Sequence, residues 1–315
     1  MKTFFPEITP FHTFFLETGS QHRVYVEQSG NPAGIPVIFL HGGPCSGTKP
    51  DHRRFFNPDR YHIILMDQRG CGQSQPFGEL QNNSTDHLIE DMEHIRQHLR
   101  IQQWLLFGGS WGAALALLYA QRYPTHVLAM ILRGVFLARQ ADMDWFLVNG
   151  VNHIFPEQWQ NLINSVKSEY RHNIAQGLFH AVFGNDSTAA FSAAKAWQSW
   201  GGITALGHLY QPHASSFDQK DLLQVQMELH YARNRYFIEE NQILENCASI
   251  AHIPATIIHG QYDLTCPLAS GWSLKEALPN AKFVILPNSG HVARGEEMIN
   301  ALVLATDEIA EHASF

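Results

Sequence analysis

The chain has 315 residues, of which 45% are hydrophobic and 16% are charged, which supplies a sizeable core and excludes global disorder. The net charge of -8, with no cluster of Lys or Arg longer than a pair, argues against a nucleic-acid-binding protein. No apolar window reaches the ~20 residues that a membrane span requires, and the amino terminus carries a lysine and two prolines where a signal peptide would be apolar.

The first 134 residues alternate between short apolar segments and helical patterns. Strands are predicted at residues 23–27, 37–40, 62–66, 104–107 and 127–132. A helix is predicted after Ser84, where apolar residues recur at helical spacing, and a second one over residues 113–123. This alternation predicts an α/β fold in which a mostly parallel sheet is flanked by helices.

A glycine turn, His41-Gly42-Gly43-Pro44, follows the predicted strand at residues 37–40. Backbone N–H groups can hold the negative charge that develops on a carbonyl oxygen during acyl transfer, provided that no side chain blocks their approach. By analogy with glycine-rich loops of this type, we assign one oxyanion N–H to Gly43 and the other to Trp111. An ordinary glycine turn is the alternative interpretation.

The next loop, Asp67-Gln68-Arg69-Gly70-Cys71-Gly72, follows the strand at residues 62–66. It resembles a phosphate-binding loop only superficially, because it lacks the Gly-Lys-Ser/Thr ending of such loops. We predict instead that it braces the oxyanion loop through hydrogen bonds from Asp67 and Arg69.

The most informative motif is Gly108-Gly109-Ser110-Trp111-Gly112, which lies between a predicted strand and a predicted helix. A serine on such a tight turn presents its hydroxyl away from the backbone, and only small neighbours let the strand and the helix pass this closely. Ser110 is therefore the candidate nucleophile. Because short Gly/Ser runs occur in many turns, the assignment requires a histidine and a carboxylate that can activate the hydroxyl.

Residues 135–250 change character to helical segments rich in Trp, Gln and His, with few strand signals. We interpret them as a helical cap inserted into the α/β core. The core would then comprise a first part at residues 1–134 and a second part at residues 251–315.

Two strands predicted after the cap each lead to a candidate catalytic residue. Residues 254–260 precede Asp263, and residues 281–286 precede His291. Hydrolases built on this serine turn have the chain order serine, acid, histidine, and open α/β sheets place their chemistry at the carboxyl ends of strands. Most of the 19 histidines must have other roles, and Asp263 could instead cap the helix that follows it. The shared strand-end placement favours Ser110, Asp263 and His291 as a catalytic triad.

Four segments resemble the signature segments of proline iminopeptidases, which are serine peptidases of the α/β-hydrolase fold. They read His41-Gly-Gly-Pro44, Asp67-Gln-Arg-Gly-Cys-Gly-Gln-Ser74, Gly108-Gly-Ser-Trp-Gly112 and Leu132-Arg-Gly-Val-Phe-Leu-Ala-Arg139. The resemblance covers nearly the whole chain. It implies that Ser110, Asp263 and His291 form the triad, that no cofactor or metal is needed, and that the substrate is a small peptide with N-terminal proline. It also implies an apolar pocket for the prolyl ring beneath the cap, with Phe136 in its wall.

Aromatic residues of the cap are further candidates for this pocket. Trp197, Trp200 and Tyr236 could line it, although burial in a helical core is the default role of such side chains. We take Phe136, Trp200 and Tyr236 as the candidate substrate-binding residues.

The chain also departs from the family pattern. Cys45 stands where the family usually has glycine, which changes the turn but leaves Gly43 in place. Family members carry a Trp-Glu-Gly segment and an Ile-Glu-Asn-His-Tyr-Phe segment in the cap, whose glutamates bind the free amine of the substrate. Here Gly201 occupies the first glutamate position, and residues 232–237, where the second segment is expected, contain no carboxylate.

An ammonium group in an apolar pocket needs a charged partner, because an unpaired buried charge costs several kcal/mol. Loss of both glutamates therefore predicts weakened aminopeptidase specificity, slow cleavage of prolyl aryl amides, and a serine esterase or amidase with a small acyl substrate as the alternative function. Glu228, Glu239 and Glu240 lie nearby and could substitute for them, although a solvated helix surface is the default position of such residues. Arg233 and Arg235 would favour a substrate with an anionic group. A non-catalytic binding protein is a third possibility, which labelling of Ser110 by a fluorophosphonate would test.

The cysteines indicate the compartment. Cys45, Cys71, Cys247 and Cys266 are scattered without metal-binding spacing, so we interpret them as reduced thiols of a soluble, cytoplasmic protein. We expect no nucleic-acid or membrane partner, and the pattern leaves the oligomeric state open.

Overall fold

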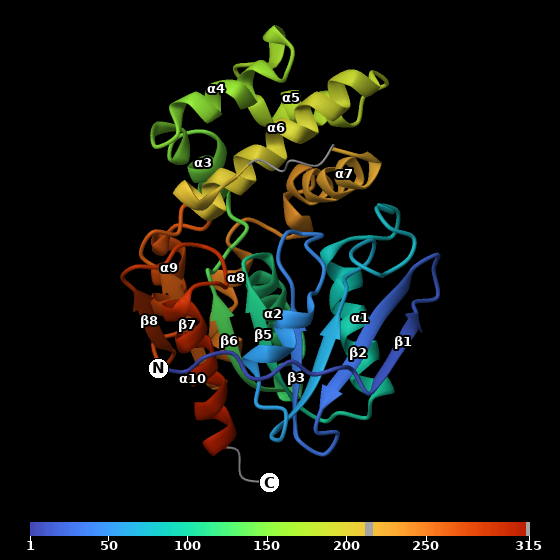
Figure 1. The fold of residues 1–315 in the computed structure, drawn as a ribbon, viewed down its shortest axis with the longest axis vertical. Coiled ribbons are helices and arrows are strands. Elements are labelled where there is room, and N and C mark those ends of the chain that lie inside the picture. The colour runs from blue at the N-terminus through green and yellow to red at the C-terminus, as the bar shows by residue number, and fades with distance from the viewer. Residues whose placement is uncertain (212–216, 313–315) are drawn as a thin grey trace.

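The computed structural model describes residues 1–211 and 217–312, which form an α/β core and a helical layer on one end of it (Figure 1). The core holds an eight-stranded sheet in the order β1-β2-β4-β3-β5-β6-β7-β8. Its strands are β1 His12–Glu17, β2 Arg23–Gly30, β3 Ile35–Leu40, β4 Tyr61–Met66, β5 Trp104–Gly109, β6 Val127–Arg133, β7 Ala255–Gly260 and β8 Lys282–Leu286. In this order, every pair of neighbouring strands from β4 to β8 is parallel, whereas the β1–β2 and β2–β4 pairs are antiparallel. The predicted fold class is confirmed, and β1 is an edge strand that the sequence analysis missed.

Helices cover both faces of this sheet. The core helices are α1 Thr85–His98, α2 Trp111–Arg122, α8 Gln242–Glu245, α9 Leu268–Ala277 and α10 Glu296–His312. On β3, Ile38 and Leu40 pack toward α1 and α2, while Val37 and Phe39 pack toward α10. Because both sides of the strand are buried, its sequence is continuously apolar rather than alternating.

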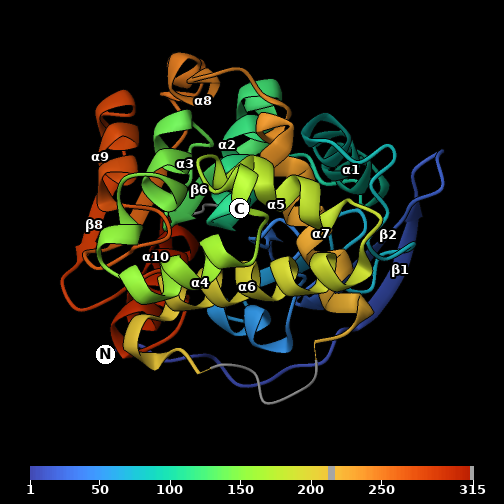
Figure 2. The same cartoon turned by 90° about the horizontal axis from the view of Figure 1, so that it is seen from above.

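The described residues between β6 and β7 contain helices and turns but no strand. The helices at the open end of the core are α3 Gln140–Leu147, α4 Pro156–Asn164, α5 Ile174–Val182, α6 Ser187–Leu206 and α7 Gln219–Arg233. They share an apolar core of their own and lie over the top of the sheet in both ribbon views (Figures 1 and 2). We propose residues 135–250 as the cap and the flanking segments as the two parts of the core. At the end of this range, α8 leaves the helical layer and packs against α2 and α9 of the core. Within the described ranges, no helix is both long and apolar enough to cross a lipid bilayer.

Close packing of β3, β5 and α2 depends on glycine. A Cβ atom on Gly112 would lie 2.0 Å from the carbonyl oxygen of Leu40, and one on Gly108 would lie 2.2 Å from that of Gly112. Backbone atoms cannot move aside as a flexible side chain could. The close packing of these strands and this helix therefore requires small residues around Ser110.

Gly112→Ala is expected to destabilise the protein by ~1–3 kcal/mol or more, because the added methyl group overlaps backbone in a packed core. Urea unfolding monitored by circular dichroism would measure the change. The matched control is Gly201→Ala in α6, where an added Cβ meets no atom within 4 Å and should leave stability equal or slightly higher. Equal stabilities of the two variants would contradict this explanation.

Candidate active site

Ser110 lies at the sharp turn between β5 and α2. Its φ and ψ angles are 58° and -123°, a left-handed φ that is unfavourable for a residue other than glycine. The turn is held because the Ser110 N–H donates to the carbonyl oxygen of Arg133 at 2.9 Å and the Ser110 carbonyl accepts from Ala113 at 2.9 Å. The strained turn leaves the hydroxyl facing a cavity between the core and the cap.

Asp263 and His291 come from the loops after β7 and β8 and are hydrogen-bonded. The His291 Nδ1 atom lies 2.8 Å and 3.0 Å from the two carboxylate oxygens of Asp263. Backbone N–H groups of Thr265 and Cys266 donate to the same carboxylate at 3.0 and 2.8 Å. Burial by itself would raise the pKa of Asp263, but the charge and hydrogen bond of His291 keep the pKa below its ordinary value. Asp263 is therefore ionised and can orient the imidazole.

The alternative role of Asp263 as a helix cap is wrong. The helix that follows, α9, has Pro267 at its N-cap position and no side-chain cap. The Asp263 oxygens instead bond within their own loop and to His291.

Ser110 and His291 line the same cavity, which has a volume of about 560 Å³. Among the residues that the structure describes, the Ser110 hydroxyl has no hydrogen bond to His291, and its Oγ lies 4.0 Å from the Cys266 Sγ. Catalytic hydrogen bonds are often long before substrate binds. Proton transfer between the two side chains therefore requires a rotation of the hydroxyl or a small shift of the imidazole.

The glycine turn after β3 lies against the nucleophile. A Cβ on Gly42 would lie 3.2 Å from the Cβ of Ser110, and Gly43 lines the cavity. Gly43 has φ +113°, and a Cβ there would meet the Cys45 nitrogen at 2.6 Å. This position therefore requires glycine, which leaves the backbone accessible beside Ser110.

The loop after β4 braces this segment through Asp67, as predicted, but its second contact comes from Gln68 rather than from Arg69. The Asp67 carboxylate accepts hydrogen bonds from the Thr48 N–H at 2.6 Å and the Thr48 hydroxyl at 2.8 Å. Gln68, which the sequence analysis did not single out, donates to the His41 carbonyl at 2.9 Å and accepts from the Trp111 indole at 2.9 Å. Gln68 thus connects the two segments that carry the candidate oxyanion donors.

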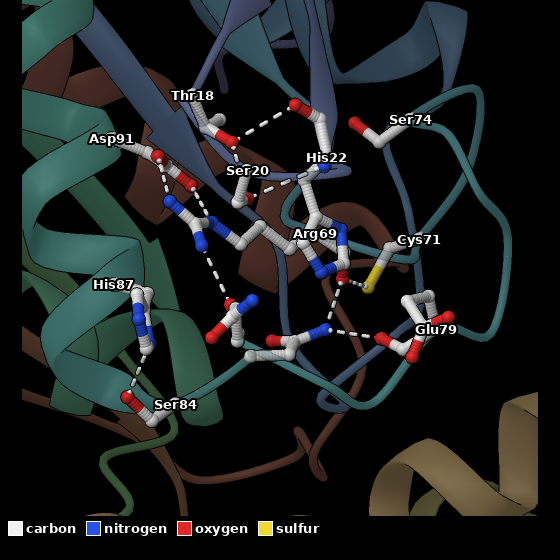
Figure 3. Close-up of polar contacts among 12 residues, drawn as sticks. Thr18, Ser20, His22, Arg69, Cys71, Ser74, Glu79, Ser84, His87 and Asp91 are labelled. Carbon is white, nitrogen blue, oxygen red and sulfur yellow. Dashed lines mark hydrogen bonds and ion pairs between the residues drawn. The ribbon is translucent and has the colours of Figure 1, made fainter.

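Arg69 has a different role from the one predicted. Its guanidinium faces both carboxylate oxygens of Asp91 on α1, at 2.6 and 2.7 Å (Figure 3). Because this ion pair occupies the side chain, Arg69 anchors the loop to α1 and does not contact the oxyanion turn.

The aromatic part of the cavity contains Phe136 and Tyr236, whose ring centroids lie 4.8 Å apart in an edge-to-face arrangement. Trp200 does not line this cavity, which corrects the sequence analysis. Its ring packs against Trp159 of α4 with centroids 5.3 Å apart, inside the cap. The face of α6 that lines the cavity carries Trp197, Gly201 and their helical neighbours instead.

Glu228 is the most important correction to the sequence analysis. Rather than lying on a solvated helix surface, it lines the cavity, where it accepts hydrogen bonds from the Trp197 indole at 2.7 Å and from Gln224 at 3.3 Å. Burial raises its pKa, and these two hydrogen bonds oppose the shift. Among the described residues no cation pairs with it. The other acidic residue of the cavity, Asp142, pairs with Arg139 at 2.9 Å.

A signal in the sequence could have located this carboxylate. Glu228-Leu-His230-Tyr231 has the same Glu-x-His-Tyr spacing as the family segment expected at residues 232–237. Tyr236-Phe237 matches only the last two residues of that segment.

The remaining charged candidates lie outside the cavity. Arg233, Arg235, Glu239 and Glu240 are exposed, so the expectation that the two arginines favour an anionic substrate is wrong. Gly201 does line the cavity, and open space surrounds the position of its missing Cβ. One of the two expected carboxylates is therefore absent and the other is present.

No group of three or more His, Cys, Asp or Glu that could hold a metal ion occurs in the described ranges. The chemistry available at this site is that of a serine hydroxyl, an imidazole and a carboxylate.

Comparisons with known proteins agree with this geometry. The family described as "alpha/beta hydrolase fold" matches residues 35–297. An esterase from Rhodococcus sp. ECU1013 has a similar fold, with a TM-score of 0.62 and 17% identity over 93% of this chain and 96% of that one. A bromoperoxidase from Bacillus anthracis has a TM-score of 0.61 and 19% identity over 95% of this chain and 98% of that one.

The relatives in sequence are more specific. A proline iminopeptidase from Xylella fastidiosa (strain 9a5c) is 42% identical over 98% of this chain and 99% of its own length. A probable proline iminopeptidase from Leptolyngbya boryana is 40% identical over 98% and 97%. A proline iminopeptidase from Arabidopsis thaliana is 38% identical over 98% of this chain and 82% of its own length.

The fold and the site define a serine hydrolase of the α/β-hydrolase class. Within that class, identities near 40% over almost the entire chain are decisive. The chain belongs to the proline iminopeptidase family.

Proposed function

We propose that this protein is a serine aminopeptidase that releases N-terminal proline from small peptides. Family membership supports the reaction class. The observation that carries the proposal is Glu228, a carboxylate without a cationic partner in the cavity that Ser110 faces. A partly buried carboxylate of this kind favours a ligand that brings a positive charge, such as the free amine of an N-terminal residue.

In the proposed mechanism His291 takes the proton of the Ser110 hydroxyl as the oxygen attacks the carbonyl carbon of the prolyl residue. Asp263 holds the imidazole through Nδ1 and stabilises its protonated form. The N–H groups of Gly43 and Trp111 bind the oxyanion of the tetrahedral intermediate. His291 then donates its proton to the leaving amine, and water hydrolyses the acyl-enzyme in a second step of the same kind.

Substrate orientation follows from the walls of the cavity. The edge-to-face rings of Phe136 and Tyr236 offer an apolar surface to the prolyl ring. Glu228 pairs with the ring nitrogen, which is charged only when the proline is N-terminal. Together these contacts would select a free prolyl residue over an internal one.

Gly201 favours a second candidate, an esterase or amidase that accepts uncharged small acyl groups. With a single carboxylate that has no cationic partner and with open space at Gly201, the cavity could hold an acyl group that carries no amine. The two functions differ in whether a free amine is required.

The deciding experiment compares a prolyl aryl amide with its N-acetylated analogue and with small aryl esters. The aminopeptidase is expected to prefer the free amine by ~10²-fold or more in kcat/KM, the factor that one buried ion pair supplies. Equal or better turnover of the acylated substrates would establish the esterase or amidase instead. Labelling by a fluorophosphonate, measured by intact mass, serves as the control for an active nucleophile.

We also propose a cytoplasmic location. The four cysteines are unpaired thiols, which favours a reducing compartment. Fractionation of the native host followed by immunoblotting would test it.

A further inference from the structure

Arg133 occupies a central position among the loops of the active site. It is the last residue of β6, which lies between the strand of Ser110 and the strand of Asp263. Its carbonyl oxygen accepts the Ser110 N–H at 2.9 Å. The next residue, Gly134, has φ +53°, and a Cβ there would lie 3.0 Å from a carboxylate oxygen of Asp263 and 3.3 Å from the Nδ1 of His291. The backbone at residues 133–134 thus contacts all three triad residues.

The side chain of Arg133 extends this role. Its Nη1 donates a hydrogen bond to the carbonyl oxygen of His291. Its guanidinium packs on the backbone of the nucleophile strand, since a Cβ on Gly109 would lie only 2.2 Å from Nη2. The His291 loop is therefore connected through Arg133 to the strand that carries Ser110.

Arg133 is partly buried and is surrounded by titratable groups. Asp263 and Cys266 of the acid loop face it, as do His259 of β7 and His52 of the turn at Pro50–Phe55. Burial lowers the pKa of Arg133, and the Asp263 charge opposes this. Arginine nevertheless stays protonated at any working pH. Among the described residues Arg133 forms no salt bridge, so its guanidinium is free to hold the His291 carbonyl.

We propose that Arg133 is a positioning residue that fixes the His291 loop against the nucleophile strand. A displacement of ~1 Å at a catalytic base can cost ~10²-fold in rate, so loss of the hydrogen bond to the His291 carbonyl should slow the reaction. This inference rests on the proposed Ser110–His291 pair.

The test separates the hydrogen bond from the charge with three variants. Arg133→Lys keeps the charge, Arg133→Gln keeps an N–H donor but not the charge, and Arg133→Met removes both. Arg60→Met is the matched control, because Arg60 likewise donates to a backbone carbonyl, that of Ala310, but lies far from the site. The main readout is the rate of Ser110 labelling by a fluorophosphonate, which does not depend on peptide specificity. Turnover of a prolyl aryl amide provides a second readout.

We expect Arg133→Met to label at least ~10-fold more slowly near neutral pH, with kcat for the aryl amide falling more than KM changes. Arg133→Lys keeps a donor of similar reach and should label faster than Arg133→Met. Arg133→Gln, whose side chain is shorter, should label at a rate between those of Arg133→Met and the wild type. Arg60→Met should match the wild type.

A wild-type labelling rate for Arg133→Met would overturn the proposal. If this variant does not fold, as judged by near-UV circular dichroism, a wild-type labelling rate for Arg133→Gln would overturn it equally. Failure of the proposed function would look different, because the wild type would then be labelled at Ser110 but would not prefer the prolyl aryl amide.

Discussion

Ser110→Ala is expected to lower kcat on a prolyl aryl amide by ~10⁴–10⁶-fold, the loss found when the nucleophile of a serine triad is removed. The physical reason is that no other described group occupies its place at the strained turn after β5. The neighbouring thiol, Cys266, cannot substitute, because burial holds its pKa well above the ordinary value and keeps it protonated. Stopped and continuous assays with the purified variant would measure the loss.

Fluorophosphonate labelling provides the control for this variant. Ser273→Ala, on the exposed side of α9, should be labelled and should turn over substrate like the wild type. Ser110→Ala should be neither labelled nor active while unfolding at the same urea concentration. Turnover within ~10-fold of the wild type would show that another residue is the nucleophile.

Glu228→Gln is expected to abolish the preference for a free amine. The value of kcat/KM for the prolyl aryl amide should fall ~10²–10³-fold, because a buried ammonium loses its charged partner, whereas that of the N-acetylated analogue should stay within ~3-fold. The amide retains an oxygen that can accept from the Trp197 indole, so the cavity wall should keep its shape. Glu239→Gln, an exposed change nearby, is the matched control.

The wild type and Glu228→Gln are also expected to differ in how their substrate preference depends on pH. Burial raises the pKa of Glu228, so its carboxylate becomes protonated at a higher pH than an ordinary glutamate as the solution is acidified. The preference of the wild type for the free amine should therefore decline as pH falls through that raised pKa. The substrate ratio of Glu228→Gln should not vary over the same range. A constant ratio in the wild type would indicate that Glu228 does not bind the amine.

The sequence was sufficient for the elements whose burial follows from local pattern. The strands from β3 to β8 contain short apolar runs bounded by turn residues, and β2 alternates apolar and polar residues, so their approximate positions could be predicted. The α/β class followed from their alternation with helices. The edge strand β1 was missed, because it is only partly buried and its polar ends do not stand out from a loop.

Within the site, the sequence determined which residue types stand at strand ends, because strand–turn–helix signals are local. It therefore pointed to Ser110, Asp263 and His291. The tertiary structure decided what no local pattern contains, namely which face of α6 and α7 meets the cavity and which loops touch across the sheet. The rotation of each helix about its axis places Glu228 and Trp197 in the cavity wall and directs Trp200 toward the interior of the cap. The order of the strands brings Arg133 next to His291. Such contacts join residues far apart in the chain, so their physical cause is packing of whole elements rather than the sequence around any one of them.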